Sequence, residues 1–156
     1  MKKILLMIFA LFCALNALNA ESLKRIHLYE SPSCGCCEMW AEYMRKNGYE
    51  ISIHKSWDFA QVKADFGIKS EFQSCHTGVI EIEGEKFALE GHLPLAAIEW
   101  FATNKPKDAI GIAVPGMPQG SPGMDFGIAQ EYPVMVLYKD GSATQMGIFK
   151  KDKQVR

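Results

Sequence analysis

Apolar residues recur along the chain at two spacings, and each spacing predicts a different kind of element. Short runs of β-branched or alternating apolar residues predict strands over residues 23–29, 49–54, 78–82 and 86–90. Apolar residues three and four positions apart predict helices over residues 38–46, 57–66 and 94–101. Turn signals separate these elements, among them Asn47-Gly48 after the first helix and Glu83-Gly84 between the last two strands.

The order of these elements predicts the fold class. Strand, helix, strand, helix, strand, strand, helix is the order of a thioredoxin-like α/β fold, a mixed sheet with helices on both faces. Residues 110–125 are rich in glycine and proline, so an extended arm is expected there rather than a helix or a central strand. Apolar runs at 132–138 and 143–149 flank Asp140-Gly141 and predict a C-terminal β-hairpin.

The first twenty residues have the composition of an export signal. Lys2 and Lys3 precede an apolar core over residues 4–15, and the segment ends at Ala20. The core is shorter than the roughly 20 residues that span a membrane, so the mature protein is not expected to be membrane-embedded. The predicted parts are a signal peptide at 1–20, removed on export to the periplasm, a thioredoxin-like domain at 21–105, and a C-terminal extension at 106–156 packed on the same domain.

The charge balance excludes one class of partner. Without Lys2 and Lys3 the chain has 15 basic and 18 acidic residues, a net charge of −3. Proteins that bind nucleic acid carry clustered basic residues that neutralise phosphates. Nucleic acid is therefore not an expected partner.

The cysteines carry the strongest chemical signal. Cys34, Cys36 and Cys37 lie within four residues at the predicted strand-to-helix turn, and Cys75 is the other cysteine of the mature chain. The orphan N–H groups at a helix N-terminus favour anions, including thiolates. In the predicted fold, the loop that carries Cys75 packs against this helix, so all four thiols should converge.

Two structural disulfides are an alternative use of four cysteines in an exported protein. The spacing argues against this alternative, because Cys36 and Cys37 can bond to each other only with backbone distortion. Cys75 alone offers a distant partner, and a domain of this length has little need of covalent cross-links. Metal binding and redox exchange are therefore the favoured interpretations.

The spacing of the thiols suits both copper binding and thiol exchange. Cys34 and Cys36 form a close chelating pair, whereas Cys34 and Cys37 have the dithiol spacing of thiol–disulfide enzymes. Thiolates are soft ligands that favour Cu(I), with zinc as a further option. Three thiolates on one turn, together with Cys75, could hold one ion or bridge several copper ions in a copper–thiolate cluster.

Two methionines and a histidine are candidate additional metal ligands. Met117 and Met124 lie in the glycine- and proline-rich arm, and their thioether sulfurs also favour Cu(I). Packing of the arm is their alternative role. His76 directly follows Cys75 and could bind metal or act as a base beside a thiol, whereas His92, at the end of a predicted strand, is expected to be structural.

Several short motifs, taken together, resemble one known family. In chain order they are Ser31-Pro32-Ser33-Cys34-Gly35-Cys36-Cys37 with Trp40, Ser74-Cys75-His76-Thr77, Glu90-Gly91-His92-Leu93-Pro94, and Ala113-Val114-Pro115-Gly116-Met117-Pro118-Gln119-Gly120-Ser121-Pro122-Gly123-Met124. This set resembles the CopG-like periplasmic copper-resistance family, long classed as a domain of unknown function. The resemblance covers essentially the whole mature chain, and one departure from the common pattern is Asp125, where many members carry Glu.

The resemblance implies a thioredoxin-like domain with a C-terminal extension that handles copper in the periplasm. Copper ions would be bound by Cys34, Cys36, Cys37 and Cys75. Components of copper efflux or oxidase systems would be its partners. The favoured prediction is thus a periplasmic protein that sequesters or relays Cu(I) in copper resistance and could cycle copper between Cu(I) and Cu(II).

The rival hypothesis is a thiol–disulfide oxidoreductase with Cys34 as the attacking thiolate and Cys37 as the resolving thiol. Against it, residues 74–77 lack the cis-proline that such enzymes usually place there, and Cys75 would compete with substrate. A binding role is favoured, and whether the chain is also an enzyme stays open. A combined hypothesis has the thiols reduce Cu(II) on capture and leave a disulfide, which another periplasmic thiol donor resets.

Overall fold

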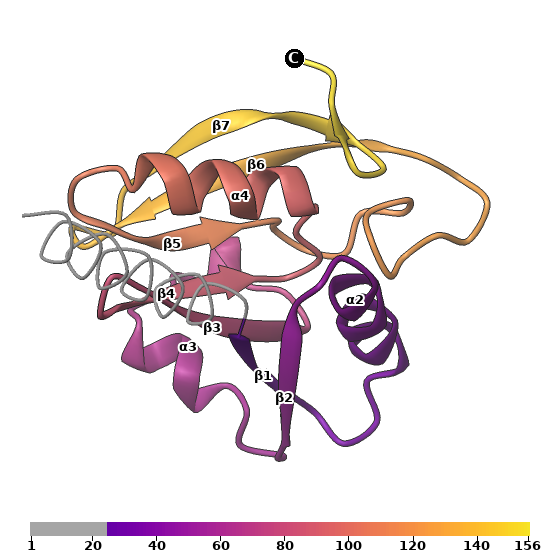
Figure 1. Cartoon of the computed structure of the whole chain (residues 1–156), viewed down its shortest axis with the longest axis horizontal. Helices are drawn as coiled ribbons and strands as arrows, with labels where there is room; N and C mark the ends of the chain where they lie inside the picture. Colours follow the sequence, from indigo (N-terminus) through magenta and orange to yellow (C-terminus); the bar gives the residue numbers. More distant parts are fainter. Residues whose placement is uncertain (1–24) are drawn as a thin grey trace, which may run out of the picture.

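The computed structural model describes residues 25–156, which form one mixed sheet of eight strands and three α-helices (Figure 1). The predicted signal peptide lies outside the described residues. The strands are β1 (Arg25–Glu30), β2 (Glu50–Lys55), β3 (His76–Ile82), β4 (Glu85–Glu90), β5 (Ala109–Ala113), β6 (Glu131–Tyr138), β7 (Ala143–Lys150) and β8 (Lys153–Gln154). The helices are α2 (Gly35–Lys46), α3 (Gln61–Asp65) and α4 (Leu95–Asn104), with a 3-10 turn, η1, at Ser70–Phe72.

The strands lie in the order β2-β1-β3-β4-β5-β6-β7-β8 across the sheet. β1 is parallel to β2 and antiparallel to β3, β3 and β4 form a hairpin, and β4 is parallel to β5. The predicted order of elements through α4 is confirmed, as is the mixed character of the sheet. β6 and β7 pair antiparallel, as the Asp140-Gly141 turn predicts.

The helices cover both faces of the sheet (Figure 1). On one face, Trp40 of α2 and Phe101 of α4 pack with Leu89 of β4 in the main apolar core. Adjacent residues of a strand point to opposite faces, so Glu90 of β4 points to the other face. There Lys63 of α3 reaches the Glu90 carboxylate. α2 and α4 therefore lie opposite α3.

Helix α2 forms because its apolar residues share one face. Buried at helical spacing are Cys37, Trp40, Ala41 and Met44. Glu38 in the first turn and Arg45 in the last complement the helix dipole. The Trp40 indole Nε1–H donates to the Leu93 carbonyl at 2.9 Å and fixes the helix to the connection between β4 and α4. Truncating such a buried aromatic residue to alanine costs about 3–5 kcal/mol of stability.

Helix α3 is shorter than the predicted helix at 57–66. It covers Gln61–Asp65, and residues 57–60 form turns instead. The Trp57 side chain is 78% exposed, so it contributes no burial that would extend the helix toward the N-terminus.

Part of the region predicted to be an arm is instead a central strand. β5 lies between β4 and β6, and its residues Ile112 and Ala113 are fully buried. Gly111 makes this possible, because it has a φ of +153° and a Cβ there would collide with the Ala88 carbonyl of β4. The glycine that disfavours a strand by propensity thus allows two backbones to approach closely.

The rest of the glycine- and proline-rich region, residues 114–130, forms no helix or strand and connects β5 to β6. We call this segment the arm. At Gly123 it packs against α2, where an added Cβ would lie 2.7 Å from the Trp40 amide nitrogen and 3.0 Å from the Cys36 carbonyl oxygen. The arm therefore crosses the first turn of the helix that carries the cysteines.

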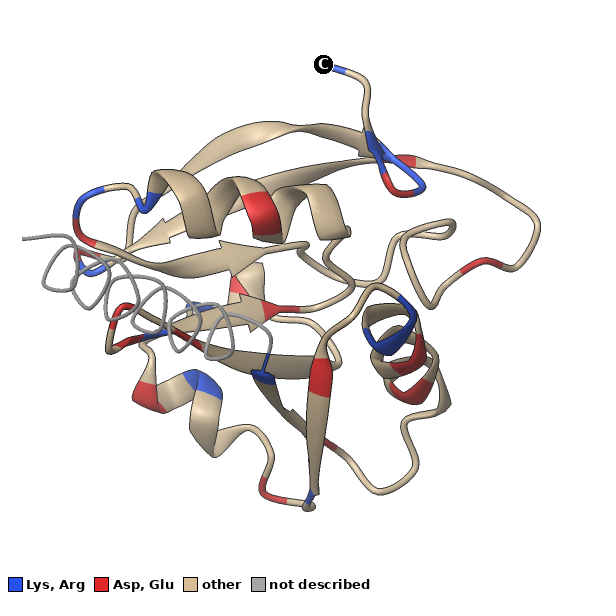
Figure 2. Ribbon diagram, in the orientation of Figure 1, with Lys and Arg blue, Asp and Glu red and all other residues tan. Residues whose placement is uncertain are grey.

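Charged residues of both signs are interspersed over the elements (Figure 2). In the described part of the chain, no helix is both long enough and apolar enough to cross a membrane.

Candidate metal centre

Four cysteine sulfurs meet where β1 ends and α2 begins. Cys34 is the N-cap residue of α2, and Cys36 and Cys37 lie in its first turn. Cys75 directly precedes β3, whose first residue, His76, pairs with the last residue of β1. The four Sγ atoms all lie within 4.8 Å of one another. The convergence predicted from the order of elements is confirmed.

The separations between the sulfurs suit metal binding. Cys36 Sγ lies 3.6 Å from Cys34 Sγ and 3.9 Å from Cys75 Sγ. Two sulfurs on one tetrahedral ion, with metal–sulfur distances of about 2.3 Å, would be about 3.8 Å apart. Cys36 is thus placed to share an ion with either neighbour or to bridge two ions.

Cys34 and Cys37 are joined by a disulfide, whereas Cys36 and Cys75 are free thiols. One bridge forms rather than two, so the cysteines do not pair off as two structural disulfides. Cys37 is fully buried and Cys34 only half-buried, which leaves the Cys34 sulfur as the accessible end of the bridge. Binding of metal by all four thiolates requires reduction of this bridge.

The Cys75 thiol has an environment that favours its neutral form. Burial raises the pKa of Cys75 to about 12, and the neighbouring Cys36 thiol adds to the shift. Cys75 is therefore protonated at neutral pH in the metal-free protein. Its thiolate would form only as a soft cation takes the place of the proton.

His92 lies closer to this cluster than its place in the sequence suggests. Its Nε2 is 3.1 Å from Cys75 Sγ, and its Nδ1 is 2.8 Å from the Pro122 carbonyl of the arm. Because a carbonyl only accepts hydrogen bonds, the proton resides on Nδ1 and the lone pair of Nε2 faces the thiol. A backbone acceptor that orients a histidine in this way is typical of metal ligands. His92 therefore lies beside the cysteines rather than remote from them, whereas its role, structural or metal-binding, stays a prediction.

His76 is buried beside the same thiol. Its Nδ1 lies 3.4 Å from Cys75 Sγ, and within residues 25–156 its Nε2 has no hydrogen-bond partner. Burial, followed by the proximity of His92, holds the pKa of His76 well below its usual range. Burial also lowers the pKa of His92, against the opposing effect of its bond to Pro122. Both rings are neutral and retain a lone pair for a cation.

A buried ion pair supports the loop that carries Cys75. The carboxylate of Glu90 accepts hydrogen bonds from Lys63 Nζ, the Ser74 amide and the Thr77 hydroxyl, each at 2.6 Å. Lys63 and Glu90 are 3% and 0% exposed. Burial raises the pKa of Glu90, whereas Lys63 and the two other donors stabilise its ionised form. The Ser74 amide is thereby held in place one residue before Cys75.

The arm contacts both cysteine-bearing segments at residues that precede the two candidate methionines in sequence. The Ser74 hydroxyl donates to the Gly116 carbonyl, and Gly123 packs on the first turn of α2. Met117, next to Gly116, is 54% exposed, and Met124, next to Gly123, is half-buried. Each methionine thus comes directly after a glycine at which the arm contacts a cysteine-bearing segment. Their roles as ligands stay predictions.

The position of His92 follows from the register of the β3–β4 hairpin. The two-residue turn pairs Ile82 with Glu85 and, at the open end, Thr77 with Glu90. Extending that register by two residues sets Cys75 opposite His92. The Glu83-Gly84 turn is recognisable in the sequence, so counting back along the hairpin would have revealed the contact.

Comparisons with known proteins agree with the cysteine cluster. A family model described as "Protein of unknown function, DUF411" matches residues 72–124, which include Cys75, His92 and much of the arm. No curated protein matches the chain. Two solved structures, named copper resistance protein CopG form 2 and form 1, are each 36% identical and cover 80% of this chain.

These two similarities extend over nearly the whole of the solved chains. The matches cover 97% and 96% of the two chains, with TM-scores of 0.71 and 0.70. Because the identity extends over most of both chains, the similarity is one of sequence as well as of fold. Together with four convergent cysteine sulfurs, it links the chain to copper. The chain belongs to the CopG family of copper resistance proteins.

Proposed function

We propose that this protein binds Cu(I) through Cys34, Cys36, Cys37 and Cys75, and that it sequesters or relays the ion in copper resistance. The observation that carries the proposal is the mutual approach of the four Sγ atoms to within 4.8 Å. Thiolates at this spacing are soft, charged donors, which favour Cu(I) over harder cations. Since Cys36 lies near both Cys34 and Cys75, the site suits a thiolate-bridged cluster of several copper ions.

The neighbouring side chains extend the donor set around the cysteines. His92 presents an unprotonated Nε2 to Cys75, and His76 lies beside the same sulfur. Met117 and Met124 of the arm would add neutral thioether donors to a site already rich in negative charge. A thioether is a soft donor without charge, so it would extend the donor set without adding negative charge to the site.

A Cu(I) titration of the reduced mature protein tests this proposal. A chromophoric chelator competes for the ion, while copper content and free thiols are measured on the same sample. Binding of two or more ions, with thiolate charge-transfer absorbance, is expected. Failure of the protein to compete with the chelator would refute a copper-binding role.

The Cys34–Cys37 disulfide supports a second, related candidate function. Its presence beside two free thiols suits a dithiol that reduces Cu(II) on capture. In this reaction two Cu(II) ions each accept one electron, the Cys34 and Cys37 thiols lose two protons, and the S–S bond forms. The half-buried Cys34 sulfur is the end at which an external thiol donor would reopen the bridge.

Stoichiometry distinguishes binding alone from reductive capture. Addition of Cu(II) to the reduced protein under anaerobic conditions should yield two Cu(I) ions for each pair of thiols lost. Retention of all four thiols, with copper remaining as Cu(II), would contradict reductive capture. Turnover of a disulfide substrate that survives replacement of Cys36 and Cys75 by serine would instead favour a general thiol–disulfide oxidoreductase.

We also infer where the protein is located and how it divides into a domain and a C-terminal extension. Strands β1–β4 with α2–α4 correspond to the predicted thioredoxin-like domain, and β5–β8 with the arm correspond to the C-terminal extension. The predicted signal peptide would direct this domain to the periplasm, where copper efflux or oxidase components could exchange copper with it. Mass spectrometry of the protein from a periplasmic extract tests this inference, and a mature N-terminus near Glu21 is expected.

A further inference from the structure

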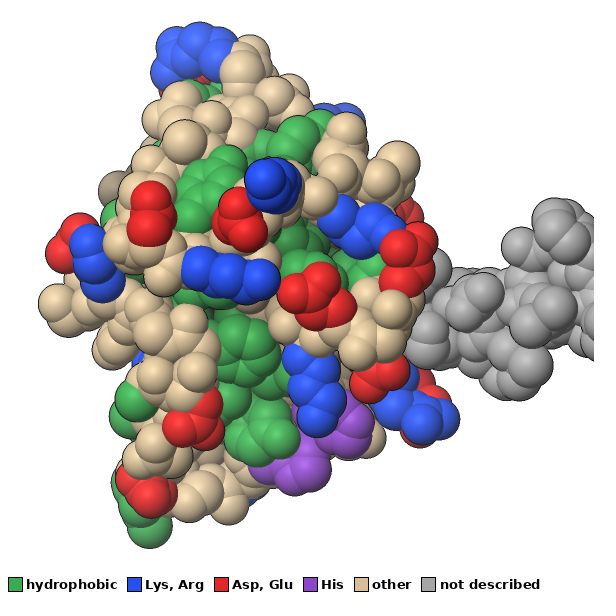
Figure 3. All heavy atoms as spheres, turned by 90° about the vertical axis from the view of Figure 1, so that its left-hand side faces the viewer, with side chains coloured by type: hydrophobic (Ala, Val, Ile, Leu, Met, Phe, Trp, Pro, Cys, Tyr) green, Lys and Arg blue, Asp and Glu red, His purple; other side chains and the backbone are tan. Residues whose placement is uncertain are grey.

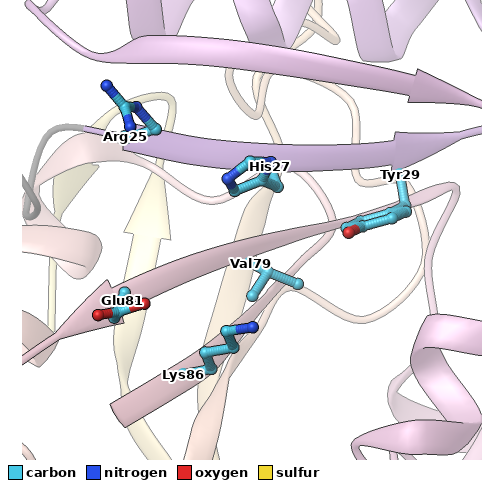
Figure 4. A pocket seen from close by; sticks show the side chains of 6 residues that line it. All are labelled: Arg25, His27, Tyr29, Val79, Glu81 and Lys86. Atoms are coloured by element: carbon cyan, nitrogen blue, oxygen red, sulfur yellow. The ribbon is translucent and has the colours of Figure 1, made fainter. Parts of the chain in front are cut away.

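Two histidine side chains lie on the face of the sheet opposite α2. Ile26 and Leu28 of β1 point into the core, so the alternate residues His27 and Tyr29 point to the other face. His27 and Tyr29 border an open groove of about 390 Å³, also lined by Val79 of β3 (Figure 4). Histidine side chains are visible at the protein surface (Figure 3).

His27 of β1 and His54 of β2 bring two ring nitrogens together on this face. His27 Nδ1 and His54 Nε2 are 3.0 Å apart, and both side chains are exposed. Two imidazole nitrogens on one ion, at metal–nitrogen distances of 2.0–2.1 Å, lie about 2.8 Å apart at right angles and about 3.3 Å apart at the tetrahedral angle. The observed separation falls between these values, so an ion can be bound with only small ring rotations.

The two rings are held in place by the strands and by an aromatic neighbour. In the parallel β1–β2 register Tyr29 pairs with His54, and the two rings stack at 4.7 Å between centroids and 16° between planes. The His27 and His54 rings also stack, at 5.3 Å. Because both histidines project from adjacent strands, a cation binds them with little loss of chain entropy.

The nearby charges do not oppose a cation at this position. Arg25 Nε and the Glu50 carboxylate form an ion pair at 3.1 Å. Lys86 of β4 lies opposite Glu81 of β3 in the strand register. Among the described residues that line the groove, Arg25 and Lys86 thus each lie beside an acidic residue, and the two imidazoles remain as candidate donors.

We propose that His27 and His54 form a second metal site, for a divalent transition-metal ion and most strongly for Cu(II). Imidazole nitrogen is a borderline donor that suits Cu(II), and Cu(II) binds more tightly than the other divalent ions of the first row. Water molecules would complete a tetragonal shell of nitrogen and oxygen donors. The inference goes beyond the proposed function, since it involves neither the thiols nor the arm.

The test uses the mature Cys36→Ser/Cys75→Ser variant as the parent, with the Cys34–Cys37 disulfide closed. Serine at both positions removes the free thiols that could bind or reduce Cu(II). Cu(II) is titrated against glycine as competitor, and electron paramagnetic resonance records the ligand nitrogens. One ion with couplings from two imidazoles is expected.

Two single variants and one matched control distinguish a metal site from a simple hydrogen-bonded pair. His27→Gln and His54→Gln should each weaken Cu(II) binding at least about 10-fold and remove one nitrogen coupling. Tyr29→Phe, which keeps the stacked ring, should bind as the parent protein does. The proposal is overturned if the parent binds no Cu(II), or if the double His27→Gln/His54→Gln variant keeps the parent affinity and spectrum. Loss of Cu(I) binding by the cysteines would leave this result unaffected.

Discussion

Cys75 and His92 face each other across the open end of the β3–β4 hairpin, with Sγ and Nε2 3.1 Å apart. One belongs to the loop before β3 and the other to the turn after β4, so the hairpin itself determines their separation. The thiol is kept protonated by burial, and the imidazole presents a lone pair to it. This pair places an imidazole nitrogen beside the sulfur cluster, as does His76, whose Nδ1 lies 3.4 Å from the same sulfur.

Replacing His92 with Gln should weaken Cu(I) binding about 10- to 100-fold, because the variant loses the nitrogen that faces Cys75. Chelator competition on the reduced protein measures the change. Trp57→Gln is the control, since the Trp57 side chain is 78% exposed and belongs to neither proposed metal site. Equal affinities for both variants would show that His92 is not a ligand.

Replacing Cys36 with Ser should lower the number of bound Cu(I) ions while the Cys34–Cys37 disulfide still forms. Cys36 is free and lies between two other sulfurs, so its loss removes the bridging donor but leaves the redox pair intact. Metal analysis and thiol counting on one sample measure both properties. An unchanged copper stoichiometry would argue strongly against a thiolate-bridged cluster.

Replacing Lys63 with Met should lower the free energy of unfolding by about 3–5 kcal/mol, because the Glu90 carboxylate stays buried without its cation. Urea denaturation measures the loss. The double variant Lys63→Met/Glu90→Gln should recover part of it, since no uncompensated charge remains. A single variant as stable as the parent would show that the ion pair is not needed for folding.

The same variant has a predictable dependence on pH. Burial already raises the pKa of Glu90 in the parent, and removal of Lys63 takes away its main opposing influence. A carboxyl whose pKa is higher in the folded than in the unfolded protein binds more protons when folded, so it favours folding more as the pH falls. The stability deficit of Lys63→Met should therefore shrink between neutral and mildly acidic pH. A deficit that grows on acidification would contradict this assignment.

Replacing Gly123 with Ala should displace the arm from α2 and weaken Cu(I) binding. Its φ is +82°, and the added Cβ would lie 2.7 Å from the Trp40 amide nitrogen. Gly127→Ala is the matched control, because φ there is +90° but no atom lies within 4 Å of the added Cβ. Both variants carry a similar backbone strain of roughly 1 kcal/mol. A greater loss of copper affinity in the Gly123 variant would therefore report the contact itself, and equal losses would contradict it.

The sequence predicts the helix and strand order well because burial on one face leaves a periodic pattern. Helix α2 and the β3–β4 hairpin lie where their apolar spacing and turn residues indicate. β5 could not be predicted in this way. Its Gly111 is needed because the backbone of Ala88 approaches it closely, and the two residues belong to segments far apart in sequence. Local propensity carries no information about such neighbours.

The residues of the site also differ in how far the sequence predicts their positions. Convergence of the four cysteines follows from the order of elements, and it is confirmed. The place of His92 depends on hairpin register, which the sequence contains but a motif search does not reveal. Which thiols are joined depends on the redox potential of the surroundings as well as on the chain. The sequence therefore indicates that Cys34 and Cys37 could form a disulfide, but it does not indicate whether they are joined.

The hydrogen bond from His92 Nδ1 to the Pro122 carbonyl ties the donor nitrogen of the site to the position of the arm. Thermodynamic linkage makes such a coupling reciprocal. If copper on Nε2 strengthens the Nδ1–H donor, then a loaded site holds the arm more firmly. By the same free energy, any partner that lifts the arm lowers the affinity for copper. Docking on the arm would thus serve as a release signal for the ion.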